Sequence, residues 1–370
     1  MTSIAAGRVL TAAGLTGPAR VEIDGDRIAA VVPLDGPDAV EAEATGRTLA
    51  PGFIDLQVNG IDDTDVATAA GDEWDRLDQL VAAQGVTTWC PTLITAPLSA
   101  IDAVIARIAA GMDRPGGGRP TIAGIHVEGP FLGGAPGAHP KQWLRPIDDR
   151  WLGDLPAAVR IVTLAPELDG AVAAVAALAA RGTVVSLGHS AASFDLAEAA
   201  TEAGASMVTH VFNGMPPLHH RTPGLLGAAL TDARLRVGLI ADGVHVHRAL
   251  LPLVFAAKGP AGIALVTDSV AWRAEHVGNV EVRMVAGTPR LADGTLAGSA
   301  LSMDRAVANV VAAGIPLDQA LIAASTTPAA ILGLDDRGVI EVGRRADLVL
   351  LDAALAVRQT WVAGQLIAGD

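Results

Sequence analysis

The middle of the chain alternates eight apolar, β-branched segments with stretches that have the spacing of helices. The eight segments are GFIDLQVNG, GVTTWCPTL, TIAGIHVEGP, VRIVTLAPE, TVVSLGHS, SMVTHVFNG, RVGLIADGVH and GIALVTDS. Continuous apolar runs of this kind are typical of parallel strands that are buried on both faces. Eight strand–helix units within about 250 residues predict an α/β protein with a (β/α)₈ barrel of the TIM type. A doubly wound open sheet is the alternative.

The stretches between these runs show the period of amphipathic helices. In one of them Ile101, Val104, Ile105 and Ile108 occupy positions i, i+3, i+4 and i+7, which places them on one helix face. Ser99 is the expected N-cap of this helix.

The two ends of the chain differ from its middle and resemble each other. The segment ARVEIDGDRIAAVV alternates polar and apolar residues around Asp24-Gly25, and ADLVLLD and RQTWVAGQLI near the end are strand-like, the second broken by Gly364. We therefore expect residues 1–50 and 336–370 to form one small β-sandwich domain. Residues 51–335 would form the barrel, with a β-hairpin insertion near 278–299 in the sequence EVRMVAGTPRLADGTL.

Composition excludes several classes of protein. Apolar residues make up 51% of the 370 residues and charged residues 18%, which is incompatible with general disorder. The formal net charge of −14 disfavours nucleic acid and anionic membranes as partners. The longest apolar run, Ala171 to Ala180, is shorter than the about 18 residues that a membrane span requires. An anionic substrate would need a locally cationic pocket.

The cysteine content and the amino terminus predict a cytoplasmic protein. Cys90 is the only cysteine, so the chain can form neither an internal disulfide nor a site of several thiolates. A small buried side chain is the simplest interpretation of Cys90. The first residues lack the basic start and long apolar stretch of a signal peptide.

Polar side chains gather at the carboxyl ends of the predicted strands, where barrel enzymes place their chemistry. They are Gln57, Asn59, His126, Glu128, His189, His210, Asp242, His245 and Asp268. Glu128, His189 and His210 offer one carboxylate and two imidazoles from three strands, and hydrolysis at a metal needs three protein ligands and an open position. A single histidine at a strand end is more often a hydrogen-bonded structural group. The recurrence of three such ligands favours a divalent metal site, most simply for Zn²⁺.

Asp268 closes the last predicted strand and is well placed for proton transfer. A carboxylate beside a metal site can take a proton from the attacking water and return it to a leaving amine. The alternative is a turn or helix N-cap residue, since Ser269 follows.

Several motifs occur in a fixed order along the chain. LAPGFIDLQVNG is followed by GIHVEGPFL, SLGHS, THVFNGMPP, ADGVHV, LVTDS and GTLAGSALSM. In this order they resemble the N-acetylglucosamine-6-phosphate deacetylases, a family of the amidohydrolase superfamily, from about Gly46 to the end of the chain. The resemblance implies hydrolysis of the acetamide of N-acetyl-D-glucosamine 6-phosphate to D-glucosamine 6-phosphate and acetate, in amino-sugar catabolism and recycling.

The resemblance also implies a role for each matching residue. Glu128, His189 and His210 match the metal ligands, in agreement with their positions at strand ends. Asp268 matches the catalytic acid and base. His139, in GAHP, matches a histidine that helps the metal to polarise the acetyl carbonyl, although a mobile loop residue is the alternative.

Four further residues match substrate contacts of the family. Asn213 and Gly214 correspond to contacts with the sugar phosphate, and His245 to a substrate-binding histidine. Arg221, in RTPGL, matches an arginine that reaches the phosphate bound by the neighbouring subunit of a homodimer. Arg221 and His245 would supply the local cationic pocket that an acidic protein needs.

The sequence departs from the superfamily pattern at the end of the first strand. Many members have His-X-His there, which holds a second metal, whereas this chain has Gln57 and Asn59. Amides are poor ligands for a zinc-like ion, so one divalent ion per subunit is expected, with Gln57 and Asn59 as water contacts or vestigial second-metal positions. His219 and His220 beside Arg221 lie outside the motif, and they either add positive charge or are exposed loop residues. Asp268 is followed by Ser-Val-Ala-Trp in place of a more usual run of small residues, which leaves the shape of the sugar pocket around Trp272 open.

Other functions remain open at this stage. An N-acetylgalactosamine-6-phosphate deacetylase would carry the same motifs. A ring amide or deaminase substrate would leave Arg221 and His245 without a purpose. A barrel that only binds or assembles is disfavoured because Asp268 and all three ligands are present.

Overall fold

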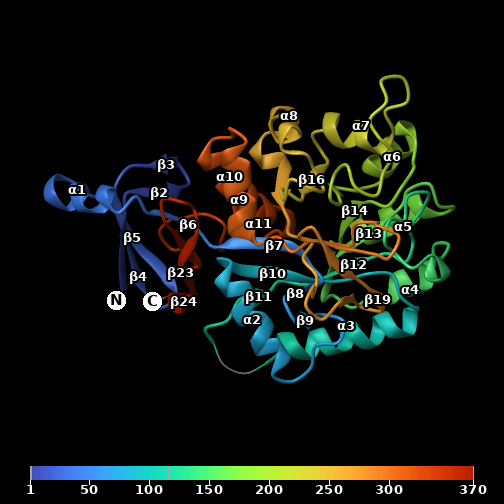
Figure 1. The fold of residues 1–370 in the computed structure, drawn as a ribbon, viewed down its shortest axis with the longest axis horizontal. Helices are drawn as coiled ribbons and strands as arrows, with labels where there is room; N and C mark the ends of the chain where they lie inside the picture. Colours follow the sequence, from blue (N-terminus) through green and yellow to red (C-terminus); the bar gives the residue numbers. More distant parts are fainter. Residues whose placement is uncertain (1, 115–116, 370) are drawn as a thin grey trace.

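The computed structural model describes residues 2–114 and 117–369 and contains a closed parallel barrel (Figure 1). In spatial order its strands are β7 (Phe53–Val58), β10 (Val86–Leu93), β12 (Ile125–Glu128), β13 (Val159–Leu164), β14 (Val184–Leu187), β15 (Met207–Val208), β16 (Arg236–Leu239) and β17 (Ile263–Leu265). Short β11 (Thr121–Ile122) also pairs with β10. A parallel bridge between Val58 and Ser269 joins the last strand to the first. The predicted (β/α)₈ barrel is confirmed, and the open-sheet alternative is wrong.

Helices surround the barrel, and their buried faces pack on its strands. They are α2 (Glu73–Ala83), α3 (Leu98–Met112), α4 (Asp149–Asp154), α5 (Ala171–Ala180), α6 (Phe194–Glu202), α7 (Gly224–Thr231), α8 (Leu251–Lys258), α9 (Met303–Ala312), α10 (Leu317–Ala324) and α11 (Thr326–Leu332). In α3, Ile101, Ile105 and Ile108 are buried as the spacing predicts. The prediction of Ser99 as N-cap is wrong: Pro97 holds that position with an extended backbone, so Ser99 lies inside the first turn.

Both ends of the chain lie in a smaller β region beside the barrel (Figure 1). One sheet has the order β1 (Thr2–Ala6), β4 (Ala19–Asp24), β5 (Arg27–Pro33). The other has the order β24 (Gln365–Gly369), β23 (Val357–Val362), β22 (Leu348–Leu351), β6 (Thr48–Pro51), β2 (Arg8–Thr11), β3 (Gly14–Thr16). Helix α1 (Gly36–Ala44) lies at the edge of this region. Residues of both sheets, among them Ile4, Val21, Leu49 and Trp361, share one buried core, as in a sandwich.

Strand β22 connects the two cores through the alternation of its side chains. Leu348 and Leu350 pack in the core of the small β region, whereas Val349 and Leu351 pack in the barrel core. Successive side chains of a strand point to opposite faces, so one strand contributes to both hydrophobic clusters. The division of the chain at 50/51 and 335/336 stays a prediction.

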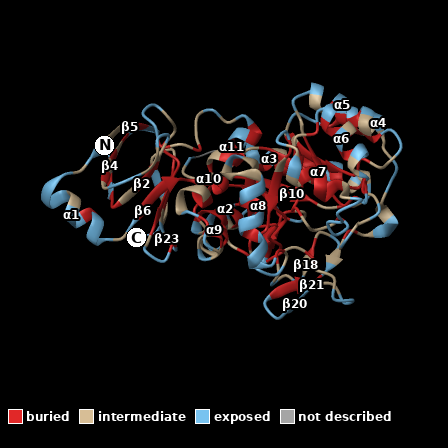
Figure 2. Ribbon diagram, turned by 90° about the horizontal axis from the view of Figure 1, so that it is seen from above, coloured by how far each residue is buried: buried red, intermediate tan, exposed pale blue. Residues whose placement is uncertain are grey.

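Short antiparallel strands lie near the barrel, and those of the predicted insertion project from one side of the molecule in Figure 2. They are β8 (Gly60–Ile61), β9 (Thr64–Asp65), β18 (His276–Val277), β19 (Val280–Glu281), β20 (Arg283–Val285) and β21 (Thr288–Arg290). Val270, Val277, Val282 and Ala297 form a small apolar core beneath them. This segment covers one side of the barrel mouth. Among the described residues, no helix combines the length and the apolar character that crossing a membrane requires.

Candidate active site

Three predicted ligands converge at the carboxyl end of the barrel. Glu128 is the last residue of β12, while His189 and His210 each lie two residues beyond their strands. His189 Nε2 and His210 Nε2 are each 3.0 Å from Glu128 Oε1, and the two Nε2 atoms are 3.0 Å apart. Three different backbone segments hold these groups, because each follows from its own strand.

The donor set fits a divalent ion. One carboxylate and two imidazole nitrogens that meet at a point are the ligand types of hydrolytic zinc sites, and a zinc ion keeps tetrahedral ligand atoms about 3.3 Å apart. His139 is a fourth candidate: together with Glu128 and His189 it can offer ligand atoms that lie within 4.8 Å of one another. The His139 Nε2 atom is 4.0 Å from Glu128 Oε1. The buried Nδ1 of His210 has no hydrogen-bond partner among the described residues. The fit to a divalent ion therefore rests on the short distances between Glu128 Oε1 and the two Nε2 atoms.

The backbone is strained where the site is built. His189, His210 and Asp268 have φ angles of 50°, 28° and 48°, in the left-handed region that non-glycine residues rarely adopt. Such conformations cost about 1–3 kcal/mol each and persist where the surrounding fold imposes them. Here each one turns the chain directly after a barrel strand, and the side chain then points into the barrel mouth.

Asp268 is held beside the ligand cluster by the two amides that replace the expected histidines. Asn59 Nδ2 donates to Asp268 Oδ1 at 2.8 Å, and Gln57 Nε2 donates to the same oxygen at 3.0 Å. Gln57 Nε2 also lies 3.1 Å from Glu128 Oε2. These amides therefore act as donors to carboxylates, a role that their positions in the sequence did not predict.

Burial and mutual charge shift the pKa values of these groups. Burial, and then the Glu128 carboxylate, raise the pKa of Asp268 to about 7. Burial would also raise the pKa of Glu128, but hydrogen bonds from His189 and His210 hold it well below its ordinary value. Burial lowers the pKa of His139. A carboxyl group whose pKa lies near neutrality can both accept and return a proton.

His139 is a fixed part of the site. Its side chain is buried, and its Nδ1 is 2.8 Å from Thr95 Oγ1, which leaves Nε2 directed at the ligand cluster. Burial and this contact support the role that the resemblance implies for His139, which stays a prediction.

Two residues that the sequence analysis missed hold the loops of the site. Thr95, two residues beyond β10, contacts His139. Glu167, beyond β13, accepts hydrogen bonds from Gly134 N at 2.9 Å, from Ala191 N at 2.8 Å and from Ser190 Oγ. It thereby ties the loop that carries His139 to the loop that follows His189. The sequence feature that could have identified Thr95 and Glu167 is their position just beyond predicted barrel strands.

A polar layer lies beneath the ligands inside the barrel. His126 Nε2 is 2.8 Å from Thr163 Oγ1, and the Thr163 hydroxyl is 2.7 Å from that of Thr209. His126 Nδ1 is 3.1 Å from the Leu56 carbonyl. His126 is therefore the hydrogen-bonded structural histidine that a strand end often carries, and not a ligand of the cluster. Asp55, also in the barrel interior, accepts from Thr267 Oγ1 at 2.6 Å and joins the first strand to the last.

A cavity of about 220 Å³ opens above the cluster. Its lining includes Asn59, Glu128, His139, His189, His210, Asn213, Gly214, His245, Asp268 and the insertion residues Val277 and 295–298. His245 Nδ1 is 2.7 Å from Asp242 Oδ2, which orients the ring. Asn213 Nδ2 donates to the carbonyls of His210 and Val211 at 3.3 and 3.2 Å.

Gly214 has a specific steric reason to be glycine. Its φ is 60°, and a Cβ at this position would lie 2.8 Å from His189 Nδ1. Any larger residue would push the His189 ring away from the cluster. The backbone here therefore helps to position a predicted ligand.

Arg221 does not line the cavity of its own chain. It lies on an exposed loop, where its Nη1 is 3.0 Å from His220 Nε2, while His219 Nδ1 is 3.0 Å from Thr222 Oγ1. Arg221 lines a separate depression of about 470 Å³ between this loop and the start of α6. Trp272 packs on the small core of the insertion and stacks with Arg273 instead of lining the catalytic cavity.

Comparisons with known proteins agree with this arrangement. Residues 48–367 match the amidohydrolase family model. An N-acetylgalactosamine-6-phosphate deacetylase of Escherichia coli O157:H7 is 40% identical over 371 residues, which cover 97% of both chains. The N-acetylglucosamine-6-phosphate deacetylase of Homo sapiens is 40% identical over 351 residues, 87% of this chain and 84% of the relative.

A solved structure extends the likeness to the whole fold. It is an aspartate-to-alanine variant of the N-acetyl-D-glucosamine-6-phosphate deacetylase of Mycobacterium smegmatis, in complex with N-acetyl-D-glucosamine-6-phosphate. It superposes with a TM-score of 0.91 at 35% identity and covers 99% of both chains. Barrel, strand-end ligand cluster and family match together show that this chain belongs to the amidohydrolase family, a family whose members use a divalent metal.

Proposed function

We propose that this chain hydrolyses the acetamide of N-acetyl-D-glucosamine 6-phosphate to D-glucosamine 6-phosphate and acetate. The position of Asp268 carries the proposal: a buried carboxyl with its pKa near 7 faces a cluster of one carboxylate and two imidazoles. Curated relatives of similar length that are about 40% identical carry this activity in their names. The arrangement suits attack of water on an amide, which needs an activated oxygen and a proton for the leaving nitrogen.

Glu128, His189 and His210 would hold one divalent ion, and we propose Zn²⁺, one per subunit. Such an ion makes water more acidic and polarises a carbonyl group. Gln57 and Asn59 support the single site because amides are poorer ligands for a zinc-like ion than imidazoles, and their side-chain nitrogens donate to the carboxylates of the site. These assignments rest on donor chemistry and on the geometry of the strand ends.

Proton transfer is the role proposed for Asp268. As water attacks the acetamide carbon, Asp268 takes one proton of the water. When the carbon–nitrogen bond breaks, Asp268 returns that proton to the nitrogen, which leaves as an amine. Asn59 and Gln57 hold Oδ1 throughout, so Oδ2 is the oxygen that can exchange the proton.

His139 is proposed to stabilise the oxygen of the acetamide as negative charge develops there. Its Nδ1 faces the Thr95 hydroxyl, and its Nε2 faces the cluster. A preorganised donor at such an oxygen is commonly worth about 2.7–4 kcal/mol.

The sugar phosphate is proposed to lie at the outer part of the cavity, against His245, Asn213 and Gly214. Arg221 is exposed and outside its own cavity, which supports the proposal that it serves the neighbouring site of a homodimer. The loop 216–222 is exposed throughout and includes Leu218, whose relative exposure is 52%. The predicted cytoplasmic location stays a prediction.

The galacto epimer is a second candidate substrate. One relative of almost equal length and 40% identity is an N-acetylgalactosamine-6-phosphate deacetylase. The catalytic groups act on the acetamide at carbon 2, whereas the epimers differ at carbon 4, so the chemistry would be the same for both.

An acetate-release assay decides between these possibilities. The purified enzyme would be tested on N-acetylglucosamine and N-acetylgalactosamine, each with and without a 6-phosphate. We expect kcat/KM to be highest for N-acetylglucosamine 6-phosphate. A higher value for the galacto phosphate would favour the second candidate, and no acetate from either phosphate would refute the proposed function.

A further inference from the structure

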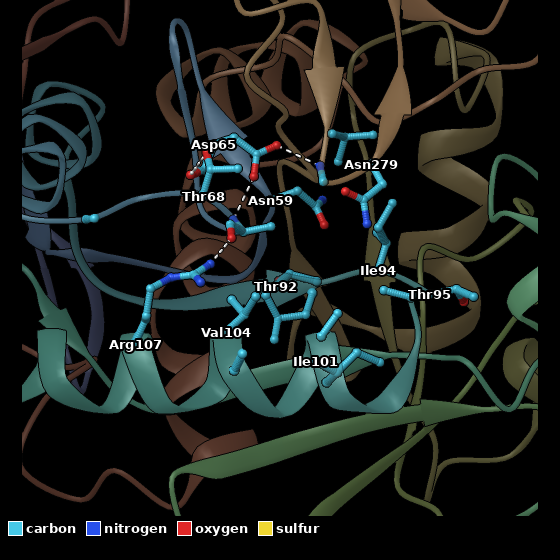
Figure 3. A pocket seen from close by; sticks show the side chains of 18 residues that line it. Asn59, Asp65, Thr68, Thr92, Ile94, Thr95, Ile101, Val104, Arg107 and Asn279 are labelled. Atoms are coloured by element: carbon cyan, nitrogen blue, oxygen red, sulfur yellow. Dashed lines mark hydrogen bonds between the residues drawn. The ribbon is translucent and has the colours of Figure 1, made fainter.

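A second, larger cavity lies beside the catalytic cavity and has no part in the proposed reaction. Its volume is about 510 Å³. It lies between α3, the loop after β9 and the start of the insertion (Figure 3). Asn59, Ile94 and Val277 line both cavities and form the wall between them. A ligand in this second cavity would therefore be close to the catalytic site without occupying it.

Most of the second cavity is apolar. Ile101 and Val104 of α3 face it, and Leu93, Ile94 and several alanines complete this side (Figure 3). Such a surface suits a short hydrocarbon group, because burying it against these methyl groups removes apolar area from water.

Arg107 supplies the positive charge of this cavity. Among the described residues, no carboxylate lies within ion-pairing distance of its guanidinium. Its guanidinium extends from α3 toward the loop after β9 and donates from Nη2 to the Ala67 carbonyl (Figure 3). Its Nε is buried and has no hydrogen-bond partner among the described residues. An unpaired guanidinium with an unused donor is costly in a half-buried position, and a carboxylate is the partner that its planar donors fit best.

Asp65 is the acidic residue that lines this cavity, and its carboxylate is already satisfied by other groups. Asp65 Oδ1 accepts from Ala67 N at 2.6 Å, and Oδ2 accepts from Gly278 N at 2.7 Å and faces His276 Nδ1 at 3.3 Å. These partners engage both oxygens of Asp65. Thr68 and the exposed Asn279 add neutral polar groups to the lining.

We propose that this cavity is a second ligand site, which binds a short-chain organic monocarboxylate. The carboxylate pairs with Arg107, and the hydrocarbon chain lies against Ile101 and Val104. This inference rests on the cavity, the unpaired cation and the apolar wall, and it holds whether or not the proposed reaction is correct.

The test is a binding measurement with hexanoate, compared with hexanol and hexylammonium at constant ionic strength. Isothermal titration calorimetry on the wild-type protein should show saturable binding of hexanoate, at least tenfold tighter than either control ligand. Arg107→Met keeps the hydrocarbon stem and removes the charge, and it should weaken hexanoate binding about 10–150-fold, as for the loss of one charge-assisted bond. Arg107→Lys should keep most of the preference for the anion.

A second variant tests whether the ligand binds in this cavity, and it does not change Arg107. Val104→Phe fills the apolar side and leaves the Arg107–Ala67 contact intact, so it should weaken binding of hexanoate and hexanol alike. Thermal melts would confirm that each variant is folded. The proposal is overturned if wild-type protein shows no saturable hexanoate binding, if Arg107→Met binds as well as wild type, or if Val104→Phe leaves the affinity unchanged.

Discussion

Asn59 donates its side-chain amide to Oδ1 of Asp268 at 2.8 Å, so a side chain just beyond the first barrel strand supports the proposed acid and base that follows the last one. This hydrogen bond lowers the pKa of Asp268 against the opposing effect of burial. The consequence can be measured as a pH dependence. The base form of Asp268 is the ionised form, and it is lost as the pH falls through the pKa of the folded enzyme.

Asn59→Ala should therefore move the acidic limb of the kcat/KM profile to higher pH. Loss of one hydrogen bond of about 0.5–1.5 kcal/mol corresponds to about 0.4–1 pH unit. In both proteins the apparent pKa of the acidic limb should lie above the ordinary carboxyl pKa of 3.8. In the wild type it should be no higher than about 7. A shift to lower pH would contradict the role assigned to Asn59.

Asp268→Asn removes the proton acceptor while it keeps the size of the side chain. We expect kcat to fall by about 10²–10⁴-fold, because general acid and base catalysis is lost, whereas substrate affinity should change little. Stopped assays for kcat and calorimetry for the dissociation constant separate the two effects. Near-normal turnover would remove Asp268 from the mechanism.

The number of metal ions bound per chain should depend on Gln57 and Asn59 at the end of β7. Wild-type protein reconstituted with a modest excess of Zn²⁺ should hold one ion per chain by elemental analysis, and removal by a chelator should abolish activity until metal is restored. The double variant Gln57→His, Asn59→His restores imidazole donors and should hold two ions. Two tightly held ions in the wild type would refute the single-metal proposal.

Gly214→Ala should displace a ligand. An added Cβ would lie 2.8 Å from His189 Nδ1, so metal affinity and activity should both fall, by about tenfold or more. Gly243→Ala is the matched control, because Gly243 has a similar φ of 79° but no atom within 4 Å of the added Cβ. Both variants share the backbone strain, and only Gly214→Ala should lose metal. Equal metal loss in the two variants would show that strain alone is responsible.

Arg221→Ala should raise KM for the phosphorylated sugar by about 10–150-fold and should hardly affect the unphosphorylated one. Mixing Arg221→Ala subunits with Asp268→Asn subunits tests whether the arginine crosses a dimer interface. In a mixed dimer, the Asp268→Asn subunit would supply its arginine to the intact site next to it, and part of the activity should return. Subunit exchange without any recovery would place Arg221 within its own chain or outside the site.

The barrel and the ligand cluster could be predicted because strand periodicity and strand ends are local features. Once eight buried parallel strands are recognised, Glu128, His189, His210 and Asp268 must meet at one end of the barrel. The hydrogen bonds of the amides could not be predicted in this way. Gln57 and Asn59 have the right positions, but the direction of an amide depends on which carboxylates lie opposite it.

Loop contacts were the other feature that local patterns did not reveal. Glu167 and Thr95 act by joining segments that are distant in sequence, and their types are equally common in ordinary turns. The start of α3 was misplaced because Ser99 is a favourable cap, yet Pro97 gives the chain its extended entry two residues earlier. The cavity around Arg107 depends on side-chain packing between three segments and has no sequence signature.

The pairing of β6 with β22 has a consequence for the biosynthesis of the protein. Leu49 and Leu350 are register partners at the centre of the six-stranded sheet, although nearly the whole barrel separates them in sequence. At about 5–20 residues per second, a ribosome needs roughly 15–60 s between the two strands. During that time the edge of β6 that pairs with β22 stays unpaired, so the terminal sheet can close only near the end of translation.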